Sequence, residues 1–523
     1  MHLIQTTARG RQVALLAIAA GVAIAACGGS GSDSGGGIVD PPVTLTKAWL
    51  GFGSDPQHTA VSQVATQQLS RIVWKTPVDL APQYSSRGYL FYHYGSPVIT
   101  AKNTVIVPVK RAVDEVYRVD ARSGQTGAVV WTLESDYMMP DHHWTPSYNV
   151  TLTGANRVYA PGGGGKVYYR DNADSADSAT QTKVFYGDAV YAASKGALDA
   201  TVFINTPITA DSRGNIYFGF TATPDNPAGL QGGIARIGAD GTGSWAAAAR
   251  LTGDSATDKA AMNSAPALSN DQKTLYVAVN GTSSTKGYLL ALDAATLQVK
   301  GKALLVDPQA QEAATISDDG TASPMVGPDG DVYMGVLETT YQQHNARGWL
   351  LHFDASLGTA KTPGSFGWDD TPSVVPASMV PSYSGSSKYL LTIKYNNYAR
   401  AGTGDSKNKV AVLDPNASQP DPIVSSVAVM KEVLTVLGQT ADPNHPEGVL
   451  EWCINTAAVD PFTKSVIVNS EDGFLYRWDL TTNTLTEKIR LDSGRGESYT
   501  PTAIGPDGTV YAINNAVLFA IGK

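Results

Sequence analysis

The chain has 523 residues, of which 42% are hydrophobic and 16% are charged. This apolar content is enough for a large core, and the low charge excludes an intrinsically disordered chain. The formal net charge of −9, with no cluster of Lys and Arg, argues against binding to nucleic acid or to an anionic lipid surface.

The amino-terminal 26 residues have the pattern of a signal peptide. Arg9 and Arg11 form a basic start, and Val13–Ala26, "VALLAIAAGVAIAA", is an apolar run of small residues. The run is about half as long as a membrane-spanning helix, which predicts a cleaved signal. Its end, Ile24–Cys27, resembles the lipobox of bacterial lipoproteins, in which the Cys is lipidated and the chain is cleaved before it. The alternative is an ordinary signal peptide with an unrelated Cys.

A Gly/Ser run, "GGSGSDSGGG", follows at residues 28–37 and is typical of a flexible tether. We therefore expect a signal peptide at 1–26, a tether at 27–47 and a single domain at 48–523. Cleavage removes two Arg and no acidic residue, so the mature net charge becomes −11. If Cys27 is lipidated, Cys453 is the remaining thiol and no intramolecular disulfide can form. We expect Cys453 to be buried and inert, with reactive or intermolecular chemistry as the alternative.

A unit of short strands recurs from about residue 95 onward. Each unit begins with a small residue and often Pro, as in "GSPVIT" and "NTPITA". An aromatic strand such as "GNIYFGF", a third strand ending near Asp and a fourth strand follow. The unit starts lie at Pro97, Pro146, Pro207, Pro266, Pro324, a weaker match near Pro376, Ala457 and Pro501. Four-stranded units at this period predict an all-β, eight-bladed β-propeller, with seven blades as the fallback.

The last unit, from residue 499 to 523, contains three strands and lacks a fourth. An isolated strand, Arg71–Leu80, "RIVWKTPVDL", lies upstream of the first unit, with Trp74 placed as Trp131 is in the first blade. We expect this strand to pair with "AVLFAIG" and complete the last blade, because closure removes two open sheet edges.

These residues carry a family resemblance. "WLGFGSDPQHTAVS", residues 49–62, followed by a strand with Trp, resembles the opening of pyrroloquinoline-quinone-type propellers, and "DARSGQTGAVVW" resembles their tryptophan-docking repeat. The resemblance covers roughly residues 48–523. The docking motif is degraded in most blades other than the first. That family includes quinoprotein dehydrogenases and the lipoprotein scaffold of outer-membrane barrel assembly.

The candidate site lies where the residues before each innermost strand form the mouth of the central channel. Adjacent His residues at 142 and 143 would point to opposite sides if extended, so one of them at most faces the channel. Three interpretations remain open: a hydrogen-bonded lining, a sugar or small-molecule site, and a metal site, for which no second ligand pair has a recognisable spacing. The candidate residues are His142, His143, Trp144, Asn205, Asn263, Glu451, Trp452, Arg495, Glu497 and Tyr499.

The sequence gives little support for a catalytic site. The resemblance implies that a quinoprotein dehydrogenase needs a stacking Trp, a calcium site of Glu and Asn, a catalytic Asp and often vicinal cysteines. Trp144, Trp452, Asn263 and Glu451 supply residue types, but vicinal cysteines and a C-x-x-C-H haem motif are missing from the sequence. "PGGGGK", Pro161–Lys166, fails as a phosphate loop at both ends and predicts a hairpin turn.

We expect a non-catalytic cell-envelope propeller that binds a protein partner or small ligand as a scaffold or binding protein. Its anchor would be a lipid on Cys27, at the periplasmic side of the outer membrane or at the cell surface. No cofactor is expected. The alternatives are a dehydrogenase dependent on pyrroloquinoline quinone (PQQ) and calcium, and a sugar-binding, small-molecule-binding or lyase-type propeller.

Overall fold

The computed structural model divides the chain into two units, Met1–Thr44 and Leu45–Lys523. The structure describes residues 47–523 except 87–89, 91, 115, 141, 143–147, 319, 321, 340–346, 396, 398–403, 494 and 495. The first unit, with the expected signal peptide and Cys27, lies outside the described residues.

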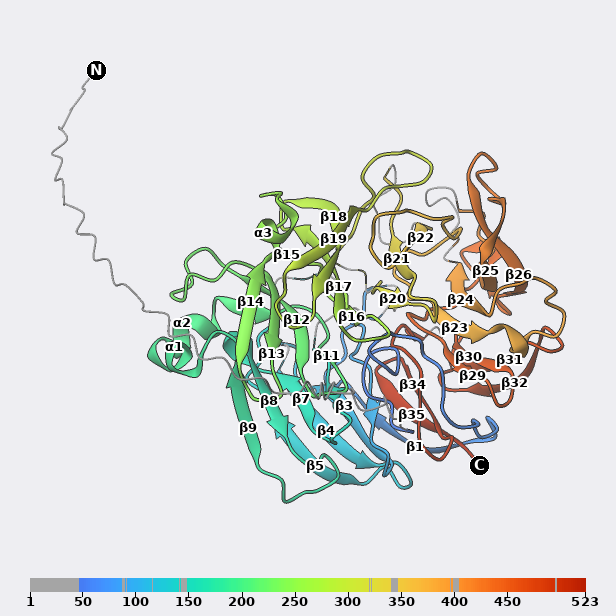
Figure 1. The fold of residues 1–523 in the computed structure, drawn as a ribbon. Coiled ribbons are helices and arrows are strands. Elements are labelled where there is room, and N and C mark those ends of the chain that lie inside the picture. Colours follow the sequence, from blue (N-terminus) through green and yellow to red (C-terminus); the bar gives the residue numbers. More distant parts are fainter. Residues whose placement is uncertain are drawn as a thin grey trace, which may run out of the picture. The chain divides into compact units, whose positions relative to one another are not determined.

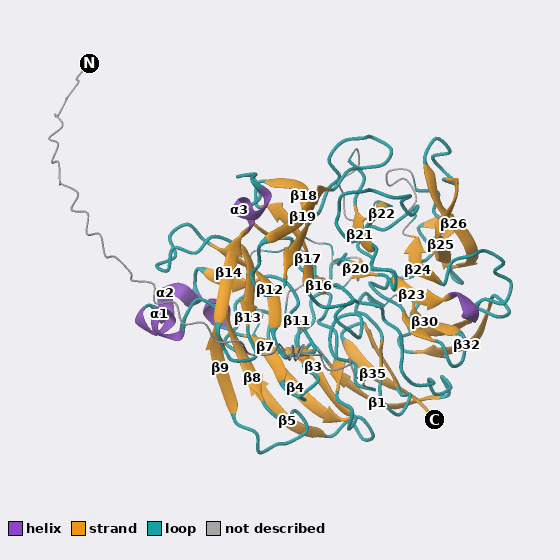
Figure 2. Ribbon diagram, viewed as in Figure 1, coloured by secondary structure: helices purple, strands orange, loops and turns teal. Residues whose placement is uncertain are grey.

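The second unit is an eight-bladed β-propeller, which confirms the predicted fold and excludes seven blades (Figures 1 and 2). Within each blade the chain runs outward from the channel through antiparallel strands. Blade 1 contains β2 (Val98–Ile99), β3 (Thr104–Lys110), β4 (Tyr117–Ser123) and β5 (Val129–Glu134), and blade 2 contains β6 (Thr151–Leu152), β7 (Val158–Pro161), β8 (Lys166–Arg170) and β9 (Thr180–Val184). Blade 3 contains β10 (Val202–Ile204), β11 (Thr209–Ala210), β12 (Ile216–Ala222), β13 (Gly233–Ile237) and β14 (Gly243–Ala247), and blade 4 contains β15 (Lys259–Ala260), β16 (Ala267–Leu268), β17 (Thr274–Gly281), β18 (Ser284–Asp293) and β19 (Val299–Leu304). Blade 5 contains β20 (Met325–Val326), β21 (Val332–Val336) and β22 (Trp349–Phe353), and blade 6 contains β23 (Ser373–Pro376), β24 (Tyr389–Tyr395), β25 (Lys409–Pro420) and β26 (Ala428–Leu437). Blade 7 contains β29 (Ala458–Asp460), β30 (Ser465–Asn469), β31 (Phe474–Asp479) and β32 (Thr484–Arg490), and blade 8 contains β33 (Ala503–Ile504), β34 (Val510–Asn514), β35 (Val517–Gly522) and β1 (Arg71–Pro77).

Burial explains the residue patterns of the strands. The second strands, such as β3, β21 and β34, are buried along their whole length, because blades pack against both of their faces. They are accordingly near-continuous apolar runs. An outer strand such as β32 alternates between exposed and half-buried residues, as a strand with one solvated face does.

The middle of the chain departs from the expected pattern in three places. The sixth unit begins at Thr371-Pro372, a few residues before the weaker match near Pro376, because the inner strand β23 already ends at Pro376. A separate hairpin, β27 (Ala441–Asp442) and β28 (His445–Val449), follows this blade. In blade 5 the fourth position is taken by residues 360–364, which pair with β22 through isolated bridges.

Helices are short in the described part of the chain. In the alanine-rich segment "GSWAAAAR" the fourth strand β14 is followed directly by α3 (Ala248–Thr252). The other helices are α1 (Asp188–Ala193), α2 (Lys195–Asp199), η1 (Gly163–Gly165) and η2 (Ala377–Met379). "PGGGGK" contains η1 and joins β7 to β8, which agrees with a turn between strands.

The predicted ring closure is confirmed. β1 pairs antiparallel with β35, from Arg71 opposite Gly522 to Pro77 opposite Val517. The amino-terminal strand therefore supplies the fourth strand of blade 8, in the order β1-β35-β34-β33. Closure covers the outer edge that β35 would otherwise expose.

Residues 49–62, here called the strap, circle inside the channel at the carboxyl-terminal ends of the inner strands (blue in Figure 1). The order of the strap residues follows the order of the blades, so the strap fills this end of the channel. Its backbone hydrogen bonds with blades 1, 2, 4, 5, 6 and 7 include Trp49 with Ile99 (2.9 Å in both directions), Leu152 N to Leu50 O (2.7 Å), Leu268 N to Pro56 O (2.7 Å), Val326 N to Gln57 O (2.9 Å), Val374 N to Thr59 O (2.9 Å) and Val459 N to Ala60 O (2.9 Å). Side chains add bonds from Gln57 Nε2 to Leu268 O and Ser269 O and between His58 Nδ1 and Pro324 O.

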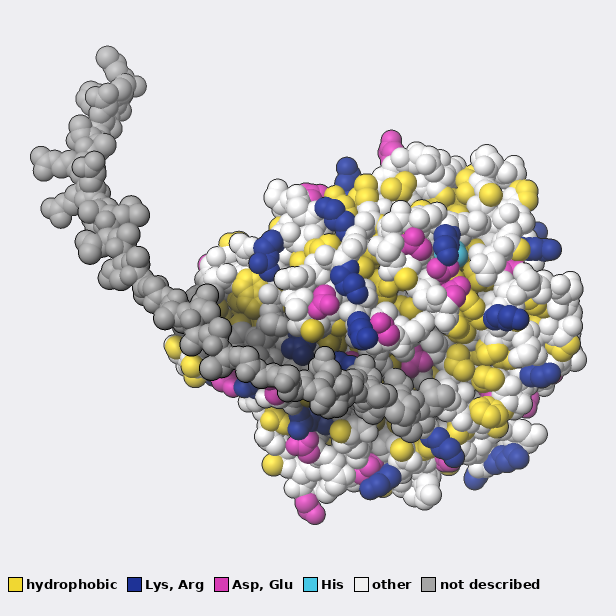
Figure 3. Space-filling view, viewed as in Figure 1, with side chains coloured by type: hydrophobic (Ala, Val, Ile, Leu, Met, Phe, Trp, Pro, Cys, Tyr) yellow, Lys and Arg dark blue, Asp and Glu magenta, His cyan; other side chains and the backbone are white. Residues whose placement is uncertain are grey.

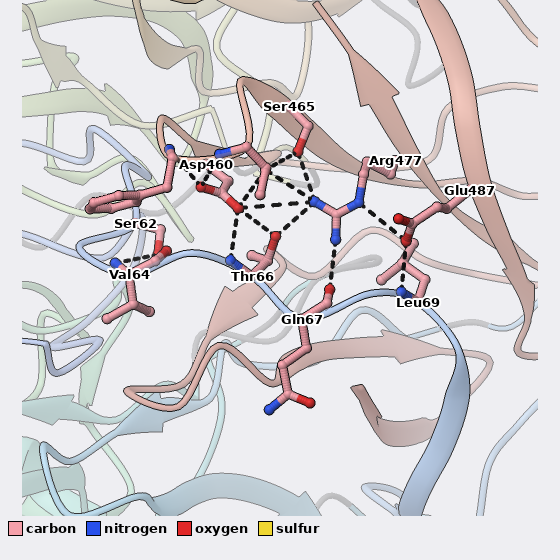
Figure 4. A network of polar contacts seen from close by, with 11 residues as sticks. Ser62, Val64, Thr66, Gln67, Leu69, Asp460, Ser465, Arg477 and Glu487 are labelled. Atoms are coloured by element: carbon pink, nitrogen blue, oxygen red, sulfur yellow. Dashed lines mark hydrogen bonds and ion pairs between the residues drawn. The ribbon is translucent and has the colours of Figure 1, made fainter. Parts of the chain in front are cut away.

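A second contact, here called the clasp, joins residues 66–69 to blade 7 (Figure 4). Arg477 donates to Thr66 Oγ1 at 2.7 Å and to the carbonyl oxygen of Gln67 at 2.6 Å. Asp460 accepts from Thr66 N at 2.7 Å, and Glu487 accepts from Leu69 N at 2.7 Å. The clasp therefore fixes the backbone between the strap and β1.

On the face shown in Figure 3, Lys and Arg side chains are interspersed with Asp and Glu. This face has no large field of positive charge. Among the helices that the structure describes, none is long and apolar enough to cross a membrane.

Candidate binding site at the mouth of the channel

The loops that lead into the inner strands line the end of the channel opposite the strap, here called the mouth. Hydroxyl, amide and backbone groups at these positions bond to the neighbouring blade and form a polar collar. The bonds include Ser96 N to Asn149 Oδ1 (2.9 Å), Asn263 N to Asn205 O (2.8 Å), Ala265 N to Ser323 Oγ (2.8 Å), Ser323 N to Thr371 Oγ1 (3.0 Å), Thr371 N to Asn455 O (3.0 Å), Asn455 N to Tyr499 O (2.8 Å) and Thr500 Oγ1 to Tyr94 O (2.8 Å).

Two of the predicted loops meet at this mouth. The loop with Glu451 and Trp452 leads from blade 6 into blade 7, and the loop with Glu497 and Tyr499 leads from blade 7 into blade 8. They are joined at Cys453, whose Sγ lies 3.5 Å from Glu497 Oε2. The structure therefore brings Glu451, Glu497 and Tyr499 into one cluster, whereas Trp452 is 1% exposed and packs against Tyr476 in the hydrophobic core.

His93 belongs to the same cluster, and sequence reasoning missed it. Its ring stacks on Tyr499 with the centroids 4.1 Å apart, and its Nε2 lies 3.3 Å from Glu497 Oε2. His93 is 4% exposed. Its position shortly before Pro97, the start of the first unit, was a signal that could have identified it.

Lys394 provides the positive charge of the cluster. It comes from β24, a second strand, and its Nζ lies 2.9 Å from Asp369 Oδ1 and 4.9 Å from the centre of the Tyr499 ring. Burial opposes the charge of Lys394, but Asp369 and other nearby acidic groups outweigh it and raise its pKa. Lys394 is therefore a buried, ion-paired cation. Burial raises the pKa of Asp370 well above its ordinary value, against the effect of Lys394.

Tyr499 ties the cluster together. Its hydroxyl donates to the carbonyl oxygen of Asp369 at 2.6 Å and accepts from Asn455 Nδ2 at 3.2 Å. The phenol is thus fixed between the loops of blades 6, 7 and 8, with a cation on one side and an imidazole stacked on it.

Cys453 is the free thiol of the described chain and is buried. Burial, together with the nearby charges of Glu451 and Glu497, raises its pKa well above the ordinary value. The reactive form of a cysteine is the thiolate, so this environment keeps Cys453 protonated. The inert thiol expected from the sequence agrees with this environment.

The other described candidates lie apart from Lys394. Asn205 donates from Nδ2 to the carbonyl oxygen of Ala260 at 2.8 Å, and Asn263 donates to that of Asp318 at 3.0 Å. Both side chains therefore hold backbone at the mouth of blades 3 to 5. The ring of His142 lies 6.2 Å from that of Tyr92. His143, Trp144 and Arg495 lie outside the described residues.

The fit to a quinone and calcium site is incomplete. Among the described residues, no group of three His, Cys, Asp or Glu side chains could hold a metal ion. The two cysteines of the sequence, Cys27 and Cys453, are far apart in the chain, so they do not form the vicinal pair of the family pattern. Trp144, the proposed stacking residue, is outside the described part.

Structural comparison places the fold. No protein-family model matches the sequence, and no curated protein matches it. A europium-containing methanol dehydrogenase is similar, with a TM-score of 0.52, 11% identity and coverage of 90% of this chain and 89% of that chain. Quinohemoprotein alcohol dehydrogenase from Comamonas testosteroni gives a TM-score of 0.53 and 12% identity over 91% and 81% of the two chains. BamB from Moraxella catarrhalis gives a TM-score of 0.33 and 11% identity over 84% of this chain and 87% of that chain. This similarity is too distant to carry an argument.

At this identity the comparison defines the fold alone. The chain has the eight-bladed propeller fold found in quinoprotein alcohol dehydrogenases. A shared fold does not establish a shared reaction.

Proposed function

We propose that this protein is a membrane-tethered propeller of the bacterial cell envelope that binds a protein partner or small ligand at the mouth, without chemistry of its own. The binding groups would be the half-buried carboxylates Glu451 and Glu497, supported by the buried Lys394 and Tyr499. A few fixed polar groups are typical of binding sites.

The state of Cys453 is the observation that carries this proposal. The thiol is buried at the mouth, its pKa is raised, and its nearest polar partner is the carboxylate of Glu497. A cysteine nucleophile needs a lowered pKa or an adjacent base that holds it as thiolate. The Glu497 carboxylate lies beside the thiol, but the pKa of Cys453 is raised and the thiol stays protonated, so the cluster supports binding better than covalent catalysis by Cys453.

The tether is supported by sequence. Ile24–Cys27 resembles a lipobox, and the Gly/Ser run follows it directly. A lipid anchor would hold the propeller near a bilayer and leave the channel mouth available for a partner. Changing Cys27 to Ser should release the protein into the soluble fraction or leave it unprocessed, and normal processing with retention at the membrane would contradict the anchor.

The test of binding without chemistry begins with the alternative cofactor. Purified protein is titrated with PQQ and calcium, and both a bound chromophore and alcohol- or sugar-dependent dye reduction are measured. The proposal expects neither. Stoichiometric quinone binding with turnover, lost in Trp144→Ala or Glu451→Ala, would establish a dehydrogenase instead.

The second part of the test looks for the bound partner and uses a variant at the mouth that keeps the size of the side chain. Glu497→Gln removes a charge that faces both His93 and Cys453. Retention of a partner from envelope extracts should fall in this variant while Asp240→Asn, in an exposed turn between β13 and β14, retains it. Equal retention by both variants would place binding elsewhere.

A further inference from the structure

A cavity lies in the outer part of blades 4 and 5, away from the cluster that blades 6 to 8 form at the mouth. Its volume is about 970 Å³, within the range of pockets that hold small ligands. One wall is the hairpin between β17 and β18, and the other is the loop that leads from β19 into blade 5. The lining of this cavity, here called the rim cavity, includes Thr285, Lys286, Leu304, Glu312, Thr315 and Thr339.

Hydrogen bonds fix both walls of the rim cavity. The amide of Ile316 donates to the carbonyl oxygen of Thr285 at 2.9 Å, so the loop lies along the hairpin. Asp307, which is 1% exposed, accepts from Gln309 N and from Thr339 N, each at 2.7 Å. The protein itself therefore holds the walls in place, as in a preformed ligand site.

A buried hydroxyl of the rim cavity has no partner. Thr315 is 2% exposed, and its backbone exchanges hydrogen bonds with Leu337 of blade 5. Its side-chain oxygen takes part in no hydrogen bond within the described part of the chain. The hydroxyl of Thr339, by contrast, donates to the carbonyl oxygen of Ala313 at 3.0 Å. Because buried polar groups are normally hydrogen-bonded, the unpaired hydroxyl of Thr315 indicates a position where a bound molecule supplies the partner.

Two opposite charges line the rim cavity without pairing. Lys286 lies on the hairpin and Glu312 on the loop, and both side chains are exposed. Neither forms an ion pair with the other or with any further residue that the structure describes. Lys259 of the same blade, by contrast, is paired with Asp318 at 2.7 Å. The rim cavity therefore offers one cation and one anion that are separated by more than an ion-pair distance.

This lining favours a ligand that carries both signs of charge. A simple anion that approached Lys286 would also meet the carboxylate of Glu312, and a simple cation would meet the ammonium group of Lys286. A neutral ligand would displace water from both charges without replacing it, which costs free energy. A zwitterion satisfies both charges, and the apolar side chain of Leu304, which is 42% exposed, is available to its carbon skeleton.

From these observations we propose that the rim cavity binds a small zwitterionic ligand, namely a short peptide with free termini. Its carboxylate binds Lys286, its ammonium group binds Glu312, and its backbone hydrogen-bonds to the hydroxyl of Thr315. A peptide spans the gap between the two charges because each residue adds about 3.5 Å to an extended chain. The rim cavity is separate from the proposed partner site at the mouth, and either site can exist without the other.

Peptides without side chains test the two charges one at a time. Isothermal titration calorimetry measures the binding of triglycine, N-acetyl-triglycine, triglycine amide and the doubly blocked peptide to the mature full-length protein. Triglycine should bind most tightly, and each blocked end should weaken binding about fivefold, the upper end for an exposed ion pair. No binding of triglycine at millimolar concentration, or the same affinity for all four peptides, would overturn the proposal.

Two variants assign each end of the peptide to its partner. In Lys286→Gln, triglycine and triglycine amide should bind equally, because the carboxylate has lost its partner. In Glu312→Gln, triglycine and N-acetyl-triglycine should bind equally, because the ammonium group has lost its partner. If either variant kept the full difference between these peptides, the assigned pair of charges would be wrong.

Further variants locate the peptide within the protein. Thr315→Val removes the hydroxyl and keeps the shape of the side chain, so it should weaken the binding of all four peptides. Lys273→Gln, an exposed position at the opposite end of blade 4, and Glu497→Gln at the mouth are the controls and should leave the affinity unchanged. Loss of triglycine binding in Glu497→Gln would place the peptide at the mouth and refute the rim cavity, whereas retention of a partner from envelope extracts tests the mouth separately.

Discussion

Trp74 donates its indole N–H to the carbonyl oxygen of Gly124, 2.8 Å away. Trp74 lies on the amino-terminal strand β1 of blade 8, and Gly124 lies in the turn after β4 of blade 1. Trp131 makes the same bond one blade further, to Ala173 O at 2.7 Å. The strand contributed by the amino terminus thus docks on the next blade as the fourth strand of blade 1 does.

This equivalence predicts the effect of removing the indole. Trp74→Phe keeps a ring but loses the hydrogen bond and part of the packing on Gly127, so it should lower the free energy of unfolding by about 1–3 kcal/mol. Chemical denaturation measures the loss. Trp131→Phe is the matched control and should lose a similar amount; an unchanged Trp74→Phe beside a destabilised Trp131→Phe would show that β1 does not support the ring.

Removal of the whole closing region should have a larger effect. Deleting residues 47–77 removes the strap, the clasp segment and β1 together, which leaves the edge of β35 open. We expect a lower Tm and aggregation in light scattering. Deleting residues 28–40 shortens the Gly/Ser run and should be nearly neutral to folding. The same Tm for both truncations would contradict closure.

Gly496 is a position at the mouth where no side chain fits. A Cβ there would lie 1.9 Å from Asn514 Oδ1, and Asn514 is itself fixed by Nδ2 bonds to Asn469 Oδ1 and Ser470 O. Gly496→Ala should cost about 1–3 kcal/mol of stability through overpacking. At Gly154 a Cβ meets nothing within 4 Å, so Gly154→Ala is the control. Comparable unfolding free energies for the two variants would show that Asn514 gives way.

His58 predicts a pH dependence. Burial lowers its pKa from 6.5 to about 4, against the hydrogen bond with Pro324 O. The unfolded state therefore binds a proton more readily, so the contribution of His58 is complete above pH 6.5 and is lost as the pH falls toward 4. The full loss is about 3 kcal/mol at 1.36 kcal/mol per pKa unit.

The measurement compares the wild type with His58→Asn by urea denaturation at pH 7, 5.5 and 4.5. Burial also raises the pKa of Asp55, which acts in the opposite direction, but Asp55 is present in both proteins. The difference in unfolding free energy should therefore shrink as the pH falls. A difference that is constant with pH would mean that the pKa of His58 is the same in the folded and unfolded states.

The ring could be predicted from the sequence because the pattern of each blade lies within one short stretch of the chain. Turn residues, apolar strands and a repeat of fixed order mark the blades, and the unpaired strand at residues 71–80 stood out beside an incomplete last unit. The start at Pro376 was misplaced because "TPSVVP" contains two prolines and both fit the pattern.

The strap, the clasp and the mouth residues His93 and Lys394 were not predictable in this way. Arg477 lies in "LYRWDL", where a charged residue on a third strand suggests a solvated position, yet it binds a segment about four hundred residues away in the chain. Lys394 comes from the second strand β24, whose residues are all buried. Its role depends on Asp369, in the loop that leads into the same blade, and on Tyr499, in the loop that leads into blade 8. No local pattern encodes such a meeting.

The most direct test of the central claim, that partners bind at the mouth, is site-specific photo-crosslinking in intact envelopes. A photoreactive amino acid is placed at Glu447, which is exposed on β28 and four residues before Glu451, or at Phe462, which is 63% exposed beside the strap end of blade 7. The account predicts a discrete crosslinked product from position 447 that disappears in a Glu497→Gln background, and none from position 462. A product from position 462 alone, or one from position 447 that Glu497→Gln leaves unchanged, would contradict it.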